Sequence, residues 1–95
     1  MSLEEDLEVT VQRIEGQLHR VVENDDDQAL FIASYLHGHF DLVVSQVLAQ
    51  SQHSILALDS QMRMSLQQAF DNNELIESDQ DQVLDLWAQL LNGRQ

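Results

Sequence analysis

The chain has 95 residues, of which 17 are aspartate or glutamate and four are arginine; it lacks lysine and cysteine, and its formal net charge is −13. The absence of cysteine excludes thiol catalysis, disulfide bonds and thiolate metal sites, and the absence of lysine excludes Schiff-base catalysis and a P-loop lysine. A charge this negative disfavours nucleic acid and anionic lipid as partners and favours basic partners, although acidic surfaces also serve solubility alone.

Length and composition indicate one helical domain over residues 1–95. A chain of this size suits a single hydrophobic core, and the absence of proline with only three glycines favours helices over a turn-rich β fold. No apolar run approaches the roughly 18 residues of a membrane span. The acidic N-terminus lacks the basic start and apolar run of a signal peptide, so we expect a cytoplasmic location without membrane association.

The first helix is predicted over residues 3–23, where apolar residues recur at three- and four-residue steps. The stripe comprises Leu7, Val11, Ile14, Leu18 and Val21, and Val22 widens it. Gly16 falls opposite this stripe. Residues 24–27, Asn-Asp-Asp-Asp, break the pattern and are typical of a helix N-cap. A calcium loop is disfavoured because the later glycine and glutamate of an EF-hand are missing.

The second helix is predicted over residues 27–49, and it carries two apolar faces rather than one. The main face comprises Ala33, Leu36, Phe40, Val43, Val44 and Val47. Phe31, Tyr35 and Leu42 form a second stripe more than a quarter turn away, flanked by Gly38 and Gln46. A helix that buries only one face does not need this second stripe.

Gly38 lies in the middle of that helix, where glycine costs about 1 kcal/mol relative to alanine. Close approach of another backbone would compensate for this cost. The approaching element could be another helix of the same chain, which we favour, or a second protomer or partner, or a ligand in a pocket.

The third and fourth helices are predicted over residues 54–70 and 79–92, and the break at residues 51–54 holds neither proline nor glycine. The third helix has one apolar face, composed of Ile55, Leu58, Met62, Leu66, Ala69 and Phe70, whereas Leu56 and Met64 fall off it. Residues 71–73 end this helix, and residues 78–81 form a variant capping box that opens the fourth. The fourth helix presents Val83, Leu86, Trp87, Leu90 and Leu91 on one face. These patterns predict an all-α, single-domain bundle of about four amphipathic helices, antiparallel or similarly orthogonal.

The run from Ala33 to Phe40 resembles the "YLRGHL"-type segment of the YfcL-like family, small bacterial proteins of unknown function. Similar order and spacing continue through Ser65-Leu66, Ala69, Glu74-Leu75, Asp79-Gln80, Val83 and Trp87. The resemblance covers most of residues 28–91 and departs from the family pattern at His37, where arginine is expected. It implies a compact helical bacterial protein, and it brings no activity or cofactor.

The histidines do not form a convincing catalytic or metal site. His37 and His39 diverge by about 200° on a helix, so they cannot chelate one metal together. An i,i+4 pair of His37 with Asp41 can orient an imidazole or simply cap the edge of the core. His39 lies beside Tyr35, where it suits a contact surface. The Glu-x-x-His pairs of a di-iron bundle and a nucleophile elbow are both missing, so we predict no catalytic, cofactor-binding or metal-ligating residues.

The leading hypothesis is a non-enzymatic, cytoplasmic protein-interaction module that binds a protein partner or a second copy of itself. Its candidate interaction surface comprises Phe31, Tyr35, Gly38, His39 and Leu42. One alternative is a small-molecule or metal-dependent enzyme that uses His37, His39 and Asp41. The other is an acidic mimic of nucleic acid, which is disfavoured because the carboxylates are spread over all four predicted helices.

Overall fold

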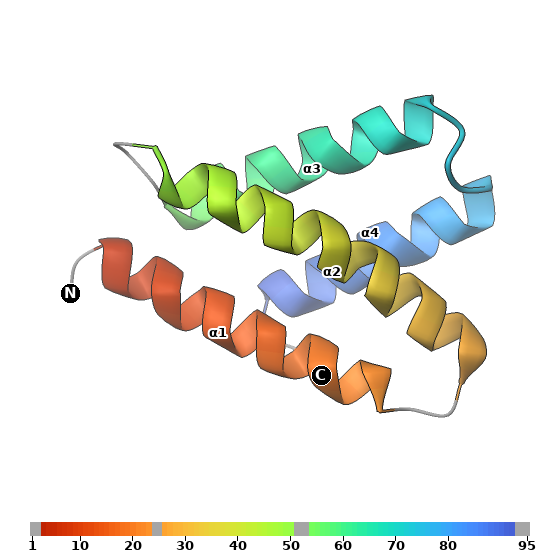
Figure 1. The fold of residues 1–95 in the computed structure, drawn as a ribbon, viewed down its shortest axis with the longest axis horizontal. Helices are drawn as coiled ribbons and strands as arrows, with labels where there is room; N and C mark the ends of the chain where they lie inside the picture. The colour runs from red at the N-terminus through yellow and green to blue at the C-terminus, as the bar shows by residue number, and fades with distance from the viewer. Residues whose placement is uncertain (1–2, 24–25, 51–53, 93–95) are drawn as a thin grey trace.

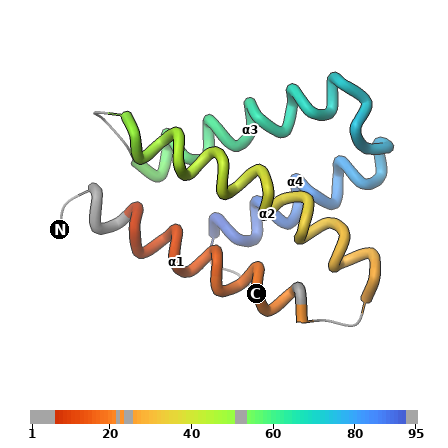
Figure 2. Tube along the Cα trace, viewed as in Figure 1, coloured from red at the N-terminus to blue at the C-terminus, as the bar shows by residue number. Residues whose placement is uncertain are grey.

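Four helices account for the fold of the computed structural model, which describes residues 3–23, 26–50 and 54–92, without the side chains of residues 3–6 and 22 (Figure 1). The helices are α1 (Leu3–Val22), α2 (Asp27–Leu48), α3 (Ile55–Asp71) and α4 (Glu77–Leu91), and the described residues contain no strand. Successive helices run in roughly opposite directions (Figures 1 and 2). The predicted all-α bundle of four helices is confirmed.

Helix α2 is the central element, because it contacts α1, α3 and α4. In Figure 1 it lies between α1 and α3, and α4 passes behind it. The core consists mainly of the predicted apolar faces, with Leu36, Phe40, Met62 and Trp87 among its fully buried side chains. Val11 and Val21 of the α1 stripe are partly buried against this core. The side chain of Val22 lies outside the described residues.

Two buried apolar side chains were missed by the periodicity argument. Ile32 is buried beside the main face of α2, and Leu75 is buried in the link between α3 and α4. Burial of Ile32 makes the buried face of α2 wider than the predicted main face. Burial of Leu75 anchors the α3–α4 link in the core.

Polar caps set the helix ends where the sequence indicated them. Asp26 caps α2 by accepting a hydrogen bond from the backbone N–H of Gln28, and Ser54 caps α3 by accepting from Ala57. At the end of α3, Asn73 takes a left-handed conformation with φ of 61°, as asparagine tolerates. Residues 24–25 and 51–53, which we also assigned to helix breaks, lie outside the described residues.

The predicted start of α4 is wrong, and so is the capping box of residues 78–81. The helix begins at Glu77, and its N-cap is Ile76, which makes no side-chain capping bond. The buried side chain of Leu75 fixes the preceding link, and Gln80 donates its side-chain amide to the Leu75 carbonyl over 2.9 Å. Ser78 therefore falls inside the first turn, because core burial of Leu75 overrides the local capping preference.

Polar contacts between helices fix α4 in the bundle. Arg13 of α1 donates to the carbonyl of Leu90 over 2.6 Å, at the C-terminal end of α4. The indole of Trp87 donates to Asp59 of α3 over 2.9 Å. Gln28, at the start of α2, donates to Asp79 over 2.9 Å. Helix α4 is thus tied to all three other helices.

Candidate interaction surface

The second stripe of α2 is not covered by another part of the described chain. The side chains of Phe31 and Leu42 are 45% and 56% exposed, respectively. Tyr35, between them, is half-buried and packs at the edge of the core. The stripe therefore faces outward, except for Tyr35, which is shared between core and surface.

Helix α3 continues this surface on the other side of a groove. The groove has a volume of about 260 Å³ and is lined by Leu42 and Gln46 of α2 and by Gln61, Met64, Ser65 and Gln68 of α3. Met64 is 55% exposed. We refer to these six residues, together with Phe31, Tyr35, Gly38 and His39, as the α2–α3 face. It joins the sequence-predicted surface to a set of α3 residues.

Two side-chain hydrogen bonds join the α2 side of the α2–α3 face to neighbouring parts of the chain. The Tyr35 hydroxyl donates to Oε1 of Glu74 over 3.0 Å, so it ties α2 to the link between α3 and α4. The Tyr35 and His39 rings lie with centroids 4.9 Å apart. His39 Nδ1 lies 2.7 Å from Oγ of Ser65, so it ties α2 to α3. The predicted packing of His39 beside Tyr35 is confirmed.

The environment of Tyr35 changes its acidity. Burial, followed by the hydrogen bond to Glu74 and by the negative charge of Glu74, raises the pKa of Tyr35 from 10.0 to about 12. The phenol is therefore neutral at physiological pH and acts as a hydrogen-bond donor.

Gly38 does not meet another helix of the same chain, and that expectation is wrong. Gly38 is exposed, and a Cβ atom added there would have no neighbouring atom within 4 Å. The same is true of Gly16 on α1. The space beside Gly38 is therefore open, and a contact with a second protomer or a partner remains a prediction.

His37 lies on a different side of α2 from His39. His37 Nε2 is 3.5 Å from Oδ1 of Asp41, and its ring lies 5.8 Å from that of His19 on α1, centroid to centroid. His39 instead contacts Ser65 of α3. The structure thus brings His37 and Asp41 together and separates them from His39. Among the described residues, no group of three or more histidine or carboxylate side chains could hold a metal ion.

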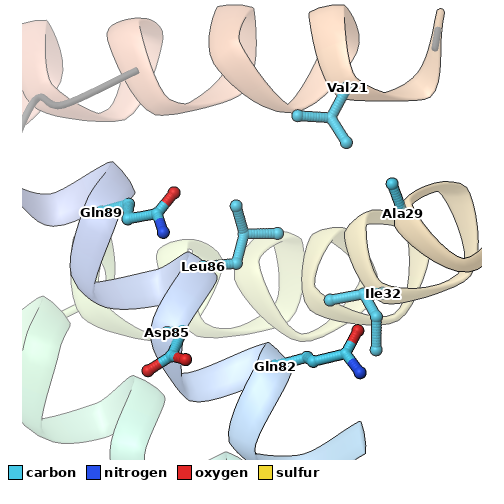
Figure 3. A pocket seen from close by; sticks show the side chains of 7 residues that line it. All are labelled: Val21, Ala29, Ile32, Gln82, Asp85, Leu86 and Gln89. Atoms are coloured by element: carbon cyan, nitrogen blue, oxygen red, sulfur yellow. The ribbon is translucent and has the colours of Figure 1, made fainter.

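A second hollow lies where the end of α1, the start of α2 and α4 meet (Figure 3). Its volume is about 260 Å³. Val21 of α1 and Leu86 of α4 point toward one another across it, and Ala29 and Ile32 of α2 close one side (Figure 3). Asp85 is the one ionisable side chain among its described lining residues. A single exposed carboxylate does not supply an acid–base pair.

The α3 part of the α2–α3 face was missed from the sequence. Met64 was recognised as lying off the buried stripe of α3, but Gln61, Ser65 and Gln68 were not assigned to a surface. The available signal was that Gln61, Ser65 and Gln68 recur at four- and three-residue steps, with Met64 three residues after Gln61 and four before Gln68. That spacing shows a shared side of α3, but it does not show that this side borders α2.

The fold and this face define a small helical bundle with an outward apolar surface. The chain belongs to the YfcL family, because the family described as "YfcL protein" matches residues 8–92. It is 32% identical over 78 residues to "Uncharacterized protein YfcL" of Escherichia coli (strain K12), which covers 82% of this chain and 85% of that protein. No solved structure matches the chain. Within the described residues, none of the helices has both the length and the apolar character to cross a membrane.

Proposed function

We propose that this protein is a non-enzymatic, cytoplasmic interaction module that binds another protein through the α2–α3 face. The observation that carries the proposal is that exposed apolar side chains from two helices line one groove, Leu42 from α2 and Met64 from α3. Phe31 is also exposed, about three helical turns before Leu42 on α2. An isolated exposed apolar residue is ordinary, whereas a cluster with a polar margin is typical of a binding surface.

The chemistry of the groove also supports protein binding. Leu42 and Met64 supply its apolar centre, and the amides of Gln46, Gln61 and Gln68 supply neutral hydrogen-bonding groups around them. Protein interfaces commonly combine a core depleted of charge with a polar rim. Methionine suits such a centre, because its flexible thioether adapts to differently shaped partners. The α2–α3 face has this composition.

The hydrogen bonds of Tyr35 and His39 also support a role for the α2–α3 face in binding another protein. Tyr35 is held by Glu74, and His39 is held by Ser65, so the α2 and α3 sides keep a fixed spacing. A preorganised surface loses less conformational freedom when a partner binds. The same contacts leave Phe31 and Leu42 exposed. These features together support a surface that is built to receive another protein.

Position-specific crosslinking in cells of the source organism tests this proposal. A photoreactive residue is placed at Leu42 in one variant and at Met64 in another, with Val9 as the matched control. Val9 is an apolar residue of α1 that is 66% exposed and stands outside the groove. We expect the same protein to be crosslinked at positions 42 and 64 and not at position 9. Equal crosslinking at position 9, or none at either groove position, would refute the proposal.

Binding between the purified chain and the purified crosslinked protein completes the test. The crosslinked protein is expected to bind the wild-type chain reversibly, and Leu42→Ser is expected to weaken this binding about tenfold, the effect of losing one apolar anchor. Leu42→Ser replaces an exposed side chain, so its free energy of unfolding, measured by thermal melting, should match that of the wild type within about 0.5 kcal/mol. Val9→Ser should change neither property.

A further inference from the structure

We infer that the partner of the α2–α3 face is a basic amphipathic helix of another protein, and not a second copy of this chain. This inference rests on the proposed function and specifies its partner. Three features carry it: the charge of the chain, the charge at one end of the face, and the shape of the groove.

The charge of the chain argues against a second copy as the partner. The net charge is −13. Two of the four arginines are engaged internally, since Arg13 donates to the carbonyls of Leu90 and Leu91 and Arg63 donates to Asp59. None of the α2–α3 face residues is lysine or arginine. Two copies of a chain this acidic would repel each other through their net charge, whereas a basic partner would be attracted and steered to the surface.

Exposed acidic side chains border one end of the α2–α3 face. Asp27 lies one helical turn before Phe31, on the same side of α2, and it is exposed. Glu74 is exposed beside the Tyr35 hydroxyl, and Asp71 is exposed at the end of α3. The opposite end, around Gln46 and Gln61, has neutral side chains. The basic residues of the partner are therefore expected to gather over the Phe31 end, with apolar residues over Leu42.

The shape of the face favours a helix over an extended strand. A strand binds by pairing with free backbone groups at a sheet edge, and the described residues of this fold form no sheet. The valley between two neighbouring antiparallel helices instead accepts a third helix along its length. From Phe31 to Leu42 the face runs along α2 for about 16 Å, at 1.5 Å per residue, which corresponds to three helical turns.

The groove has room for a side chain of the partner helix. Its volume of about 260 Å³, between Leu42 and Met64, offers a place for an apolar side chain. Gly38 does not line the groove; it is exposed one helical turn before Leu42, and a Cβ built on it meets no atom within 4 Å, so nothing obstructs a helix that passes along α2 there. A helix with apolar residues at three- and four-residue steps would place its anchors along Phe31, Leu42 and Met64.

Three synthetic peptides of about 15 residues, long enough to span the face, test the inference. The first has leucines at helical spacing and arginines and lysines on its other sides. The second has the same composition in an order that destroys the apolar stripe. The third keeps the stripe and replaces each basic residue with glutamate. Binding to the wild-type chain is measured by calorimetry, and the contacted residues are mapped by amide chemical shifts.

We expect the first peptide to bind at least about tenfold more tightly than the other two, because it alone offers both the stripe and the complementary charge. Its chemical-shift changes should lie on α2 and α3. The double variant Leu42→Ser/Met64→Ser leaves the net charge unchanged and should weaken this binding about tenfold or more. Val9→Ser is the matched control and should have no effect. Asp27→Asn should weaken it as well, and Glu15→Asn on α1 should not.

Several results would overturn the inference. Equal binding of the reordered basic peptide would mean that charge alone attracts it. Unchanged binding to the double variant would place the peptide elsewhere, and light scattering that shows a wild-type dimer broken by Leu42→Ser would assign the face to a second copy. If Leu42→Ser/Met64→Ser lost its helical circular dichroism, Phe31→Ser would replace it in the same comparison. Crosslinking of positions 42 and 64 to a partner without a basic helix would refute this inference while retaining the proposed function.

Discussion

The hydroxyl of Tyr35 donates a hydrogen bond of 3.0 Å to Oε1 of Glu74, although the two residues are separated by 39 positions in the sequence. Tyr35 lies in the middle of α2, and Glu74 lies in the link that leads from α3 to α4. The bond therefore connects the central helix to the turn that positions the last two helices. It also fixes the one aromatic ring of the α2–α3 face that is shared with the core.

The acidity of Tyr35 provides a direct test of this contact. Burial and Glu74 raise its pKa to about 12, and Tyr35 is the one tyrosine in the chain, so phenolate absorbance reports on it alone. We expect Glu74→Gln to lower the pKa and to leave it above 10.0, because burial is the largest cause of the shift. Glu77→Gln is the control and should leave the titration unchanged. A folded wild-type chain that titrates near pH 10.0 would contradict the contact.

The same shift predicts how stability depends on pH. The folded-state pKa of Tyr35 is higher than the unfolded value of 10.0, so the neutral phenol favours the folded state. This contribution is fully present below pH 10.0 and is lost as the pH rises toward about 12. Urea unfolding across this range should show a steeper loss of stability in the wild type than in Tyr35→Phe, which cannot titrate. Parallel curves would refute the prediction.

Gly38 is expected to tolerate alanine and to gain stability from it. An exposed glycine inside a helix costs about 0.5–1 kcal/mol relative to alanine, and a Cβ at Gly38 has no neighbour within 4 Å. Gly38→Ala should therefore raise the melting temperature by several degrees, at roughly 4–8 °C per kcal/mol for a domain of this size. Gly16→Ala on α1 should give a similar gain. A loss of stability in Gly38→Ala alone would show that space there is restricted.

A larger side chain at Gly38 distinguishes an effect on folding from an effect on binding. Gly38→Leu is expected to fold as well as the wild type, because the space around this position is open. It should weaken binding of a helix to the α2–α3 face, since the added side chain occupies the path of the partner backbone. Calorimetry with the basic amphipathic peptide measures this effect. Undiminished binding would place the partner backbone away from Gly38.

The helices and most of the core could be predicted from the sequence, because each buried face repeats with the helical period. Leu58, Met62 and Leu66 illustrate this regularity, and all three are fully buried. The start of α4 could not be predicted from local signals, since it depends on burial of Leu75 in a core that the whole chain forms. Local capping preferences are weaker than such tertiary packing.

The candidate surface was predictable on α2 and not on α3, for a related reason. Phe31 and Leu42 depart from the main apolar face of α2, so one helix alone identifies them as a second stripe. Whether another helix covers that stripe does not follow from the sequence, and the structure shows both side chains exposed. The contact of His39 with Ser65 depends on how α2 and α3 rotate against one another. That rotation is set by side-chain packing between the helices, which a periodic pattern within each helix does not specify.

The buried tryptophan is expected to depend on Asp59. Trp87 is completely buried, and its Nε1 donates to Oδ1 of Asp59 over 2.9 Å. Asp59→Ala would leave a buried donor without this acceptor, at a cost of about 1–3 kcal/mol. Asp59→Asn keeps an acceptor oxygen and should cost less. Urea unfolding followed by the fluorescence of Trp87, the one tryptophan in the chain, measures both effects.

Arg63 supplies the control for this prediction. Its Nε donates to the same carboxylate oxygen of Asp59, but its own side chain is 55% exposed. Arg63→Ala should therefore change stability by no more than about 0.5 kcal/mol, as for an exposed i,i+4 ion pair. If Arg63→Ala proved as costly as Asp59→Ala, the salt bridge and not the indole contact would be the source of the stability.

Arg13 is expected to stabilise the bundle by binding the end of α4. Its guanidinium donates to the carbonyls of Leu90 over 2.6 Å and of Leu91 over 3.3 Å, where the helix dipole also favours a cation. Arg13→Met keeps much of the apolar stem and removes the donors, which should cost about 1–2 kcal/mol because the contact is only partly buried. Arg20→Met makes the same change of charge at an exposed position of α1 and should cost less than about 0.5 kcal/mol. Urea unfolding at low and high salt distinguishes the causes. If both variants lost the same stability and the loss disappeared at high salt, overall charge would be its cause. If Arg13→Met lost more stability than Arg20→Met and the difference persisted at high salt, the contact with the α4 carbonyls would be its cause.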